Sequence, residues 1–135
     1  MTRIYSFLFL FFLLSAPKAY SFTKVSPNAY SYSLADVDYS KADSTKVVKL
    51  LREASRLKSS TNWMTYFGKQ FCGVPYVAKT LERNKTERLI VNLRQLDCTT
   101  FVETTLALTL CAKNGKTSFA DYCHYLRLVR YCQGR

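Results

Sequence analysis

The chain has 135 residues, with 20 lysines and arginines against 9 aspartates and glutamates, so its formal net charge is +11. This length fits one small domain plus a segment removed at its start, and the charge favours anionic partners such as nucleic acid, anionic lipid or cell-wall polymers. Specific nucleic-acid binding is not expected, because the cations are scattered, no run of five like charges occurs and no aromatic RNA-binding signature is present.

Residues 1–21 are typical of a signal peptide. Arg3 precedes an apolar run from Tyr5 to Leu14, and Ala19 and Ser21 form a small-residue cleavage site. The run is shorter than the roughly 20 residues of a membrane-spanning helix. We therefore expect a secreted or periplasmic protein with no stable membrane insertion after cleavage, and an uncleaved N-terminal anchor is the alternative. Cleavage removes two cations and leaves a net charge of +9, from 18 cations and 9 anions.

Residues 22–43 are rich in serine, tyrosine and aspartate without a clear period, which predicts a linker or an extended segment. The domain proper is predicted over residues 44–135. It begins with an amphipathic helix over Ser44–Ser59, capped by Asp43 or Ser44. The apolar stripe of this helix consists of Val47, Val48, Leu50, Leu51, Ala54 and Leu57. A shorter helix is predicted over Asn62–Phe67, with Gly68 as its stop.

The segment FCGVPYVAKTLE follows at residues 71–82. Gly73 and Pro75 force a turn or extended geometry around Val74, and Tyr76 comes directly after. A polar loop then leads to a strand predicted over Leu89–Leu93, whose branched apolar residues are typical of a strand entering a core.

A buried central helix is predicted after this strand, because apolar residues cover most of its circumference from Phe101 to Cys111. Two start signals overlap: Asp97 can cap the helix, and Thr100 with Glu103 has the capping-box spacing. Either start puts Cys98 at or just before the first turn. Unpaired backbone N–H groups and the helix dipole favour a thiolate there, so a nucleophile or a packing residue are both consistent with the pattern.

The chain has cysteines at positions 72, 98, 111, 123 and 132. Their spacings match no zinc pattern, so no metal site is expected. Cys111 and Cys123 fall on apolar helix faces and are expected to be packing residues, with a disulfide between them as the alternative. The last helix is predicted over Phe119–Tyr131, after a turn at Asn114–Gly115 and a cap formed by Ser118 with Asp121.

Two segments carry a family resemblance. GVPYVAKTLE and LDCTTFVE resemble the GxPYxxGG and DCSGFV elements of NlpC-type cell-wall cysteine peptidases, a branch of the papain-like fold. The chain is more similar still to the N-acetylmuramoyl-L-alanine amidase-like family, which shows PYVA-TLE, V-N-L and L-D-C-T-T-F-V-E in this order. The resemblance covers roughly residues 45–132.

The resemblance implies an α+β, papain-like domain in which Cys98 attacks an amide carbonyl. Tyr76 would lie beside Cys98 and orient the substrate, and the helix start at Cys98 and Thr99 could supply the oxyanion donors. The implied partners are peptidoglycan or muramoyl-peptide fragments, and no cofactor is implied.

A cysteine amidase also needs a histidine that takes and returns the proton. The only histidine is His124, inside the last predicted helix, where a surface histidine beside Asp121 is the simpler interpretation. The resemblance implies a histidine on a sheet strand well after the cysteine helix. We therefore expect the helical N-terminal half of the fold, with the sheet largely missing, in a truncated copy.

Two further positions depart from the family pattern. Lys79 stands where the family tends to have glycine, and Cys72 stands where an aliphatic residue is usual and is expected to fill an apolar hole. Three functions stay open at this point: a cysteine amidase, an inactive fragment or wall-binding module, and an unrelated basic helical domain stabilised by disulfides.

Overall fold

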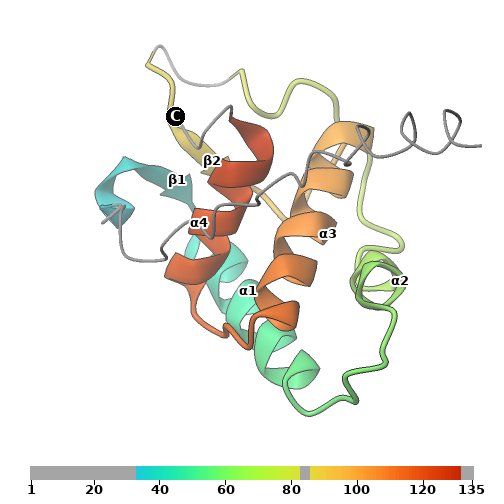
Figure 1. The fold of residues 1–135 in the computed structure, drawn as a ribbon. Helices are drawn as coiled ribbons and strands as arrows, with labels where there is room; N and C mark the ends of the chain where they lie inside the picture. The colour runs from blue at the N-terminus through green and yellow to red at the C-terminus, as the bar shows by residue number, and fades with distance from the viewer. Residues whose placement is uncertain (1–32, 83–85, 132–135) are drawn as a thin grey trace, which may run out of the picture. The chain divides into compact units, whose positions relative to one another are not determined.

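The computed structural model describes residues 33–82 and 86–131 (Figure 1). The elements in chain order are a 3-10 helix η1 (Leu34–Asp36), β1 (Val37–Tyr39), α1 (Lys41–Ala54), α2 (Trp63–Lys69), β2 (Leu89–Val91), α3 (Cys98–Lys113) and α4 (Phe119–Arg130). The expected signal peptide, residues 1–21, lies outside the described residues. Across the described ranges, no helix is long and apolar enough to cross a membrane.

The helices accompany a small parallel sheet, so the described residues form an α+β arrangement. β1 pairs with β2 in the register Val37 to Leu89 and Tyr39 to Val91. A separate parallel bridge joins Tyr76 to Leu96. Residues 33–43, which the sequence assigns to a linker or extended segment, hold η1, β1 and the first residues of α1.

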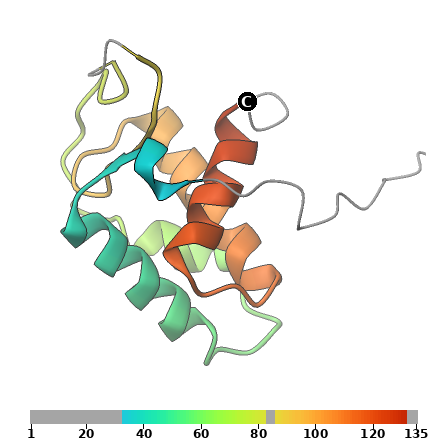
Figure 2. The same ribbon diagram turned by 90° about the vertical axis from the view of Figure 1, so that its left-hand side faces the viewer.

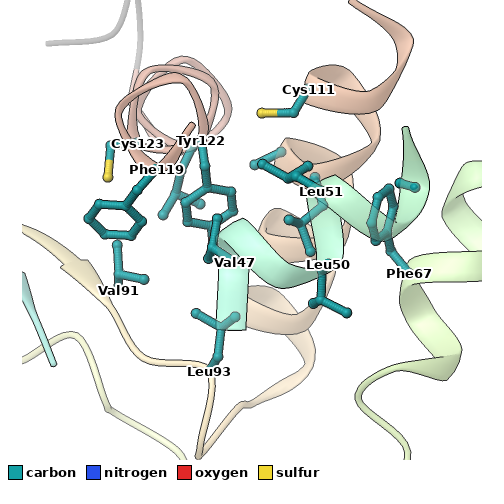
Figure 3. Close-up of a cluster of buried hydrophobic side chains, with 14 of the residues drawn as sticks. Val47, Leu50, Leu51, Phe67, Val91, Leu93, Cys111, Phe119, Tyr122 and Cys123 are labelled. Carbon is teal, nitrogen blue, oxygen red and sulfur yellow. The ribbon is translucent and has the colours of Figure 1, made fainter. Parts of the chain in front are cut away.

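α3 is the central helix, as predicted: it packs against α1, α2 and α4. Figures 1 and 2 show α4 returning alongside α3 in the opposite direction. The core lies between these helices and β2, and Figure 3 shows part of it. Its most deeply buried side chains include Val47, Leu51, Phe67, Leu89, Leu93, Leu108, Cys111, Tyr122 and Leu126.

α1 begins at Lys41, so the predicted start at Ser44 is wrong. Ser40 is the N-cap, because its Oγ accepts a hydrogen bond from the Asp43 N–H at 3.1 Å and Asp43 Oδ2 accepts one from the Ser40 N–H at 3.3 Å. The predicted end at Ser59 is also wrong. Ser55 is the C-cap and donates its hydroxyl to the Arg52 carbonyl, and Leu57 beyond it is 42% exposed.

The predicted N-terminus of α2 is confirmed, since Asn62 is its N-cap, but Gly68 does not end the helix. α2 continues to Lys69, and Gly68 instead faces α3. A Cβ at position 68 would lie 3.5 Å from Phe101 Cζ, an ordinary van der Waals contact, so this position packs beside the Phe101 ring.

β2 ends at Val91 rather than at the predicted Leu93. The Asn92 side chain accepts a hydrogen bond from the Arg94 N–H at 3.1 Å, which turns the chain away from the strand direction. The Leu93 N–H bonds Asp43 Oδ1 at 3.0 Å, tying this turn to the start of α1. The predicted cap of α4 is confirmed, because Ser118 Oγ accepts a hydrogen bond from the Asp121 N–H, and the helix ends at Arg130.

Candidate functional site

The start of α3 is fixed by a reciprocal capping box between Asp97 and Thr100. Asp97 Oδ1 accepts hydrogen bonds from the Thr100 N–H and the Thr100 hydroxyl, each at 2.8 Å, and Thr100 Oγ1 accepts one from the Asp97 N–H at 2.9 Å. The Asp97 cap is therefore confirmed, and the predicted box between Thr100 and Glu103 is wrong. These bonds, the Thr100 N–H first, lower the pKa of the Asp97 carboxyl. The same bonds favour the charged form of this carboxyl, in the residue directly before Cys98.

This cap makes Cys98 the first residue of α3. Its thiol is free and exposed. At this position the backbone N–H groups of the first turn have no partner within the helix, and the helix dipole favours negative charge. The local arrangement suits a thiolate nucleophile and an oxyanion formed next to it.

A cavity of about 280 Å³ lies beside Cys98. Its lining residues come from the segment before residue 77 and from the start of α3: Phe71, Val74, Tyr76, Leu96, Asp97, Cys98 and Phe101. Apart from Cys98 and Asp97, the lining is apolar or aromatic. The largest cavity described, about 610 Å³, lies elsewhere, along α1 and Phe119, and includes none of the predicted site residues.

Backbone hydrogen bonds between residues 75–77 and Leu96 place Tyr76 at this cavity. The Val77 N–H donates to the Leu96 carbonyl at 3.1 Å, and the Leu96 N–H donates to the Pro75 carbonyl at 3.2 Å. Gly73 enters the turn before this segment with a φ of +83°, a conformation that glycine adopts at no steric cost. The Tyr76 side chain is 70% exposed. The structure thus brings Tyr76 and Cys98 to one cavity, while their chemical roles stay predictions.

Thr99, the other predicted substrate-binding residue, is exposed and does not line the cavity. Its Oγ1 lies 4.0 Å from Cys98 Sγ. The hydroxyl therefore lies close to the thiol but outside the cavity lining. Its role also stays a prediction.

Two aromatic residues of the cavity wall had not been identified from the sequence. The rings of Phe71 and Phe101 meet edge to face, with centroids 6.4 Å apart, and Lys46 Nζ lies 4.8 Å from the Phe71 centroid. Phe101 was counted among the apolar residues that cover most of the circumference of a buried helix, yet it is 36% exposed. Its spacing of three residues from Cys98, which places both on one helix face, was the available signal.

His124 lies in the middle of α4, half-buried, with its ring centroid 5.3 Å from that of Tyr125. It is not among the residues that line the cavity beside Cys98. The structure therefore does not join the chain's histidine to its candidate nucleophile.

The other described cysteines divide into two kinds. Cys72 is exposed, so the expectation that it fills an apolar hole is wrong: Phe71, the residue before it, turns inward instead. Cys111 and Cys123 are buried free thiols, which confirms them as packing residues. Burial raises the pKa of each to about 12. Cys132 lies outside the described residues.

Lys79 has a φ of +60°, in the left-handed region that favours glycine. This is the position where the resemblance implies a glycine. Lysine is strained there, so this departure from the family pattern has a physical cost.

Comparison with known proteins identifies one family. The model of the AmiA-like family, described as N-acetylmuramoyl-L-alanine amidase-like, matches residues 66–135, which is more than half of the chain. The match includes Tyr76, Lys79 and the whole of α3 with Cys98. No curated protein and no solved structure matches the chain.

Proposed function

The chain belongs to the N-acetylmuramoyl-L-alanine amidase-like family, and we propose that it presents the nucleophile of a cysteine amidase, Cys98, to peptidoglycan or muramoyl-peptide fragments. The observation that carries the proposal is the exposed Cys98 thiol at the first position of α3, at the edge of a cavity shared with Tyr76. Family membership rules out the alternative of an unrelated helical domain.

We propose further that the fold is the papain-like, NlpC-type fold. The position of the cysteine at the start of the central helix supports this assignment. So does the short parallel bridge that holds the Tyr76 segment next to α3.

In the proposed reaction the Cys98 thiolate attacks the carbonyl carbon of the amide. A C–S bond forms and the C–N bond breaks as the amine leaves with a proton, and water then hydrolyses the thioester to a carboxylic acid and the free thiol. Backbone N–H groups at the start of α3 would donate to the oxyanion. The reaction also needs a proton carrier, and His124 does not line the cavity.

This position of His124 favours a second candidate, a wall-binding module without catalysis. Such a module would keep the cavity and the Tyr76 segment for recognition. The net charge of +9 that remains after cleavage of residues 1–21 would add a general attraction to anionic wall polymers. Secretion or export to the periplasm, which either candidate requires, is proposed from residues 1–21. The mass of the protein recovered from its host tests it, since cleavage would remove these residues.

An activated ester tests whether Cys98 is a nucleophile without the need for a proton carrier. The p-nitrophenyl ester of N-acetylmuramic acid has a leaving group that needs no proton, so Cys98 should be acylated without help from a histidine. We expect a muramoyl adduct on Cys98, seen by peptide mass spectrometry, in the wild type and in Cys72→Ala, and none in Cys98→Ala. Equal acylation of Cys72 and Cys98 would contradict a prepared nucleophile.

The amide substrate gives the complementary result. With N-acetylmuramoyl-L-alanyl peptide we expect no turnover by the 135-residue chain, because the described residues place no histidine at the cavity. Turnover that disappears in Cys98→Ala would show that the chain has its own proton carrier.

A further inference from the structure

We propose that the cavity beside Cys98 holds an uncharged, apolar substituent on the acyl side of the scissile amide, and that Phe71 and Phe101 select for it. The proposal rests on the proposed function and specifies its substrate class. Acyl groups that would bring a carboxylate into this cavity should be excluded.

The cavity wall is apolar and already formed. Phe71 is 4% exposed and Leu96 is 6% exposed, and Val74 completes the wall from the turn that follows α2. Phe101 stands one helical turn after Cys98, so its ring lies on the same face of α3 as the thiol. An apolar group bound here would be removed from water against rigid rings.

Each of the two rings also contacts a residue that does not line the cavity. The Lys46 ammonium of α1 sits 4.8 Å from the Phe71 centroid, a cation–π distance, without lining the cavity itself. The backbone N–H of Phe71 donates to the Gly68 carbonyl at 3.2 Å, and Gly68 also lies beside the Phe101 ring. The wall therefore needs little rearrangement to accept a ligand.

The described residues that line the cavity offer an anionic group no cationic partner, and the nearby Lys46 ammonium is engaged with the Phe71 ring. Among the described residues that line it, none is lysine, arginine or histidine, and the one charged group is the Asp97 carboxylate. Asp97 Oδ1 accepts hydrogen bonds from the Thr100 N–H and hydroxyl, and a carboxylate oxygen can only repel a second anion. A second carboxylate would be desolvated beside this one without a partner.

The size of the cavity limits what it can hold. At about 280 Å³ it lies at the lower end of small-molecule sites, which span roughly 300–1,000 Å³. It therefore suits a single side chain or a short branched substituent. A sugar ring with its attached peptide would extend over Tyr76 toward solvent.

Alkylation of the 135-residue chain with matched iodoacetamides tests this selectivity without any turnover. The reagents are N-benzyl iodoacetamide, which is apolar, and N-carboxymethyl iodoacetamide, which is anionic, and Cys72 is an exposed reference thiol in the same molecule. The measured quantity is the benzyl-to-carboxymethyl rate ratio at each cysteine, from peptide mass spectrometry. We expect the ratio to be on the order of tenfold higher at Cys98 than at Cys72.

Phe101→Ala should bring the Cys98 ratio down to that of Cys72. The matched control is Val102→Ala, because Val102 is 52% exposed on the same turn and does not line the cavity. Circular dichroism and thermal unfolding of both variants show whether α3 is intact. The ratio at Cys72 corrects for the general attraction of the anionic reagent to the positively charged protein. Equal ratios at the two cysteines in the wild type, or equal effects of the two substitutions, would overturn the inference.

The outcomes also separate this inference from the proposed function. If the muramoyl ester acylates Cys98 but the benzyl preference is absent, only the apolar subsite is wrong. If the ester does not acylate Cys98 in preference to Cys72, the assignment of Cys98 as the nucleophile is wrong.

Discussion

Arg130 Nε donates to Glu103 Oε2 at 2.8 Å, and this ion pair joins the end of α4 to the first half of α3. The two side chains are only 8% and 15% exposed, respectively. Arg130 Nη1 also donates to the Ile90 carbonyl at 2.8 Å, so one guanidinium connects two helices with β2. The helix that carries Cys98 is thereby fixed against the sheet.

Removal of one member of this pair should be strongly destabilising. Arg130→Ala leaves the Glu103 carboxylate buried without its partner, and we expect a loss of about 3–5 kcal/mol in the free energy of unfolding from urea denaturation. The control is Lys49→Ala, which breaks the exposed pair of Lys49 with Glu53 at 3.9 Å. That substitution should cost no more than about 0.5 kcal/mol. Similar losses in the two variants would contradict a structural role for Arg130.

The Asp97 cap should stabilise α3 in a pH-dependent way. Because the folded-state pKa of Asp97 is lowered, its stabilising contribution is complete above the ordinary value of 3.8 and is lost as the pH falls below it. Asp97→Asn keeps a capping oxygen, so it should match the wild type at neutral pH and lack this part of the acid dependence. Asp97→Ala should lose about 1 kcal/mol at neutral pH. Urea midpoints at neutral pH and at about pH 3 distinguish the three proteins.

The two buried thiols should limit stability at alkaline pH. In the unfolded chain Cys111 and Cys123 ionise around their ordinary pKa of 9.0, whereas in the folded protein they stay neutral until about pH 12. The contribution of these two thiols to stability is therefore constant below pH 9 and falls as the pH rises above it, by at most about 1.4 kcal/mol per pH unit for each thiol. Urea midpoints from about pH 8 to pH 10 measure the slope. Cys123→Ala should reduce it, and the exposed Cys72→Ala should leave it unchanged.

Lys79→Gly should stabilise the protein. A left-handed conformation costs a non-glycine residue about 1–2 kcal/mol, and the greater entropy of unfolded glycine cancels about 0.5–1 kcal/mol of that gain. We expect a net increase of about 0.5–1 kcal/mol, measured by thermal and urea unfolding. Lys113→Gly is the matched control at a helical position and should gain nothing. A loss of stability in Lys79→Gly would mean that the lysine side chain makes a stabilising contact.

Local sequence patterns predicted the helices of the fold. Contacts between residues far apart in sequence, which such patterns do not show, help to determine where the elements begin and end. The apolar stripe of α1, the cap of α4 and the Asp97 start of α3 could be predicted because each depends on residues within one or two helical turns. β1 was missed, since Val37 is its only buried residue and a three-residue strand has no readable period. The Glu103–Arg130 pair and the Asp43–Leu93 bond join residues far apart in sequence, so no local pattern predicts them.

Some residues of the candidate site could be predicted from the sequence and others could not. Cys98 and Tyr76 were found because each stands in a recognisable short motif, and the structure places both at one cavity. Phe71 and Phe101 were missed because an apolar residue before a turn and another on a central helix both indicate core packing. Phe101 is 36% exposed and Phe71 only 4%, and which apolar side chain of a segment meets a cavity depends on the packing between elements rather than on local sequence.

The parallel pairing of β1 with β2, reinforced by the Asp43–Leu93 bond across 50 residues of chain, has a consequence for the order of folding. Closing so long a loop costs entropy before any contact repays it, whereas α3 and α4 are joined by a short turn. We therefore expect the α3–α4 hairpin to form in the folding transition state and β1 to dock afterwards. In stopped-flow measurements Leu108→Ala should slow folding, and Val37→Ala should mainly accelerate unfolding. β1 would then detach before the helices of the domain, leaving the helix that carries the thiol in place.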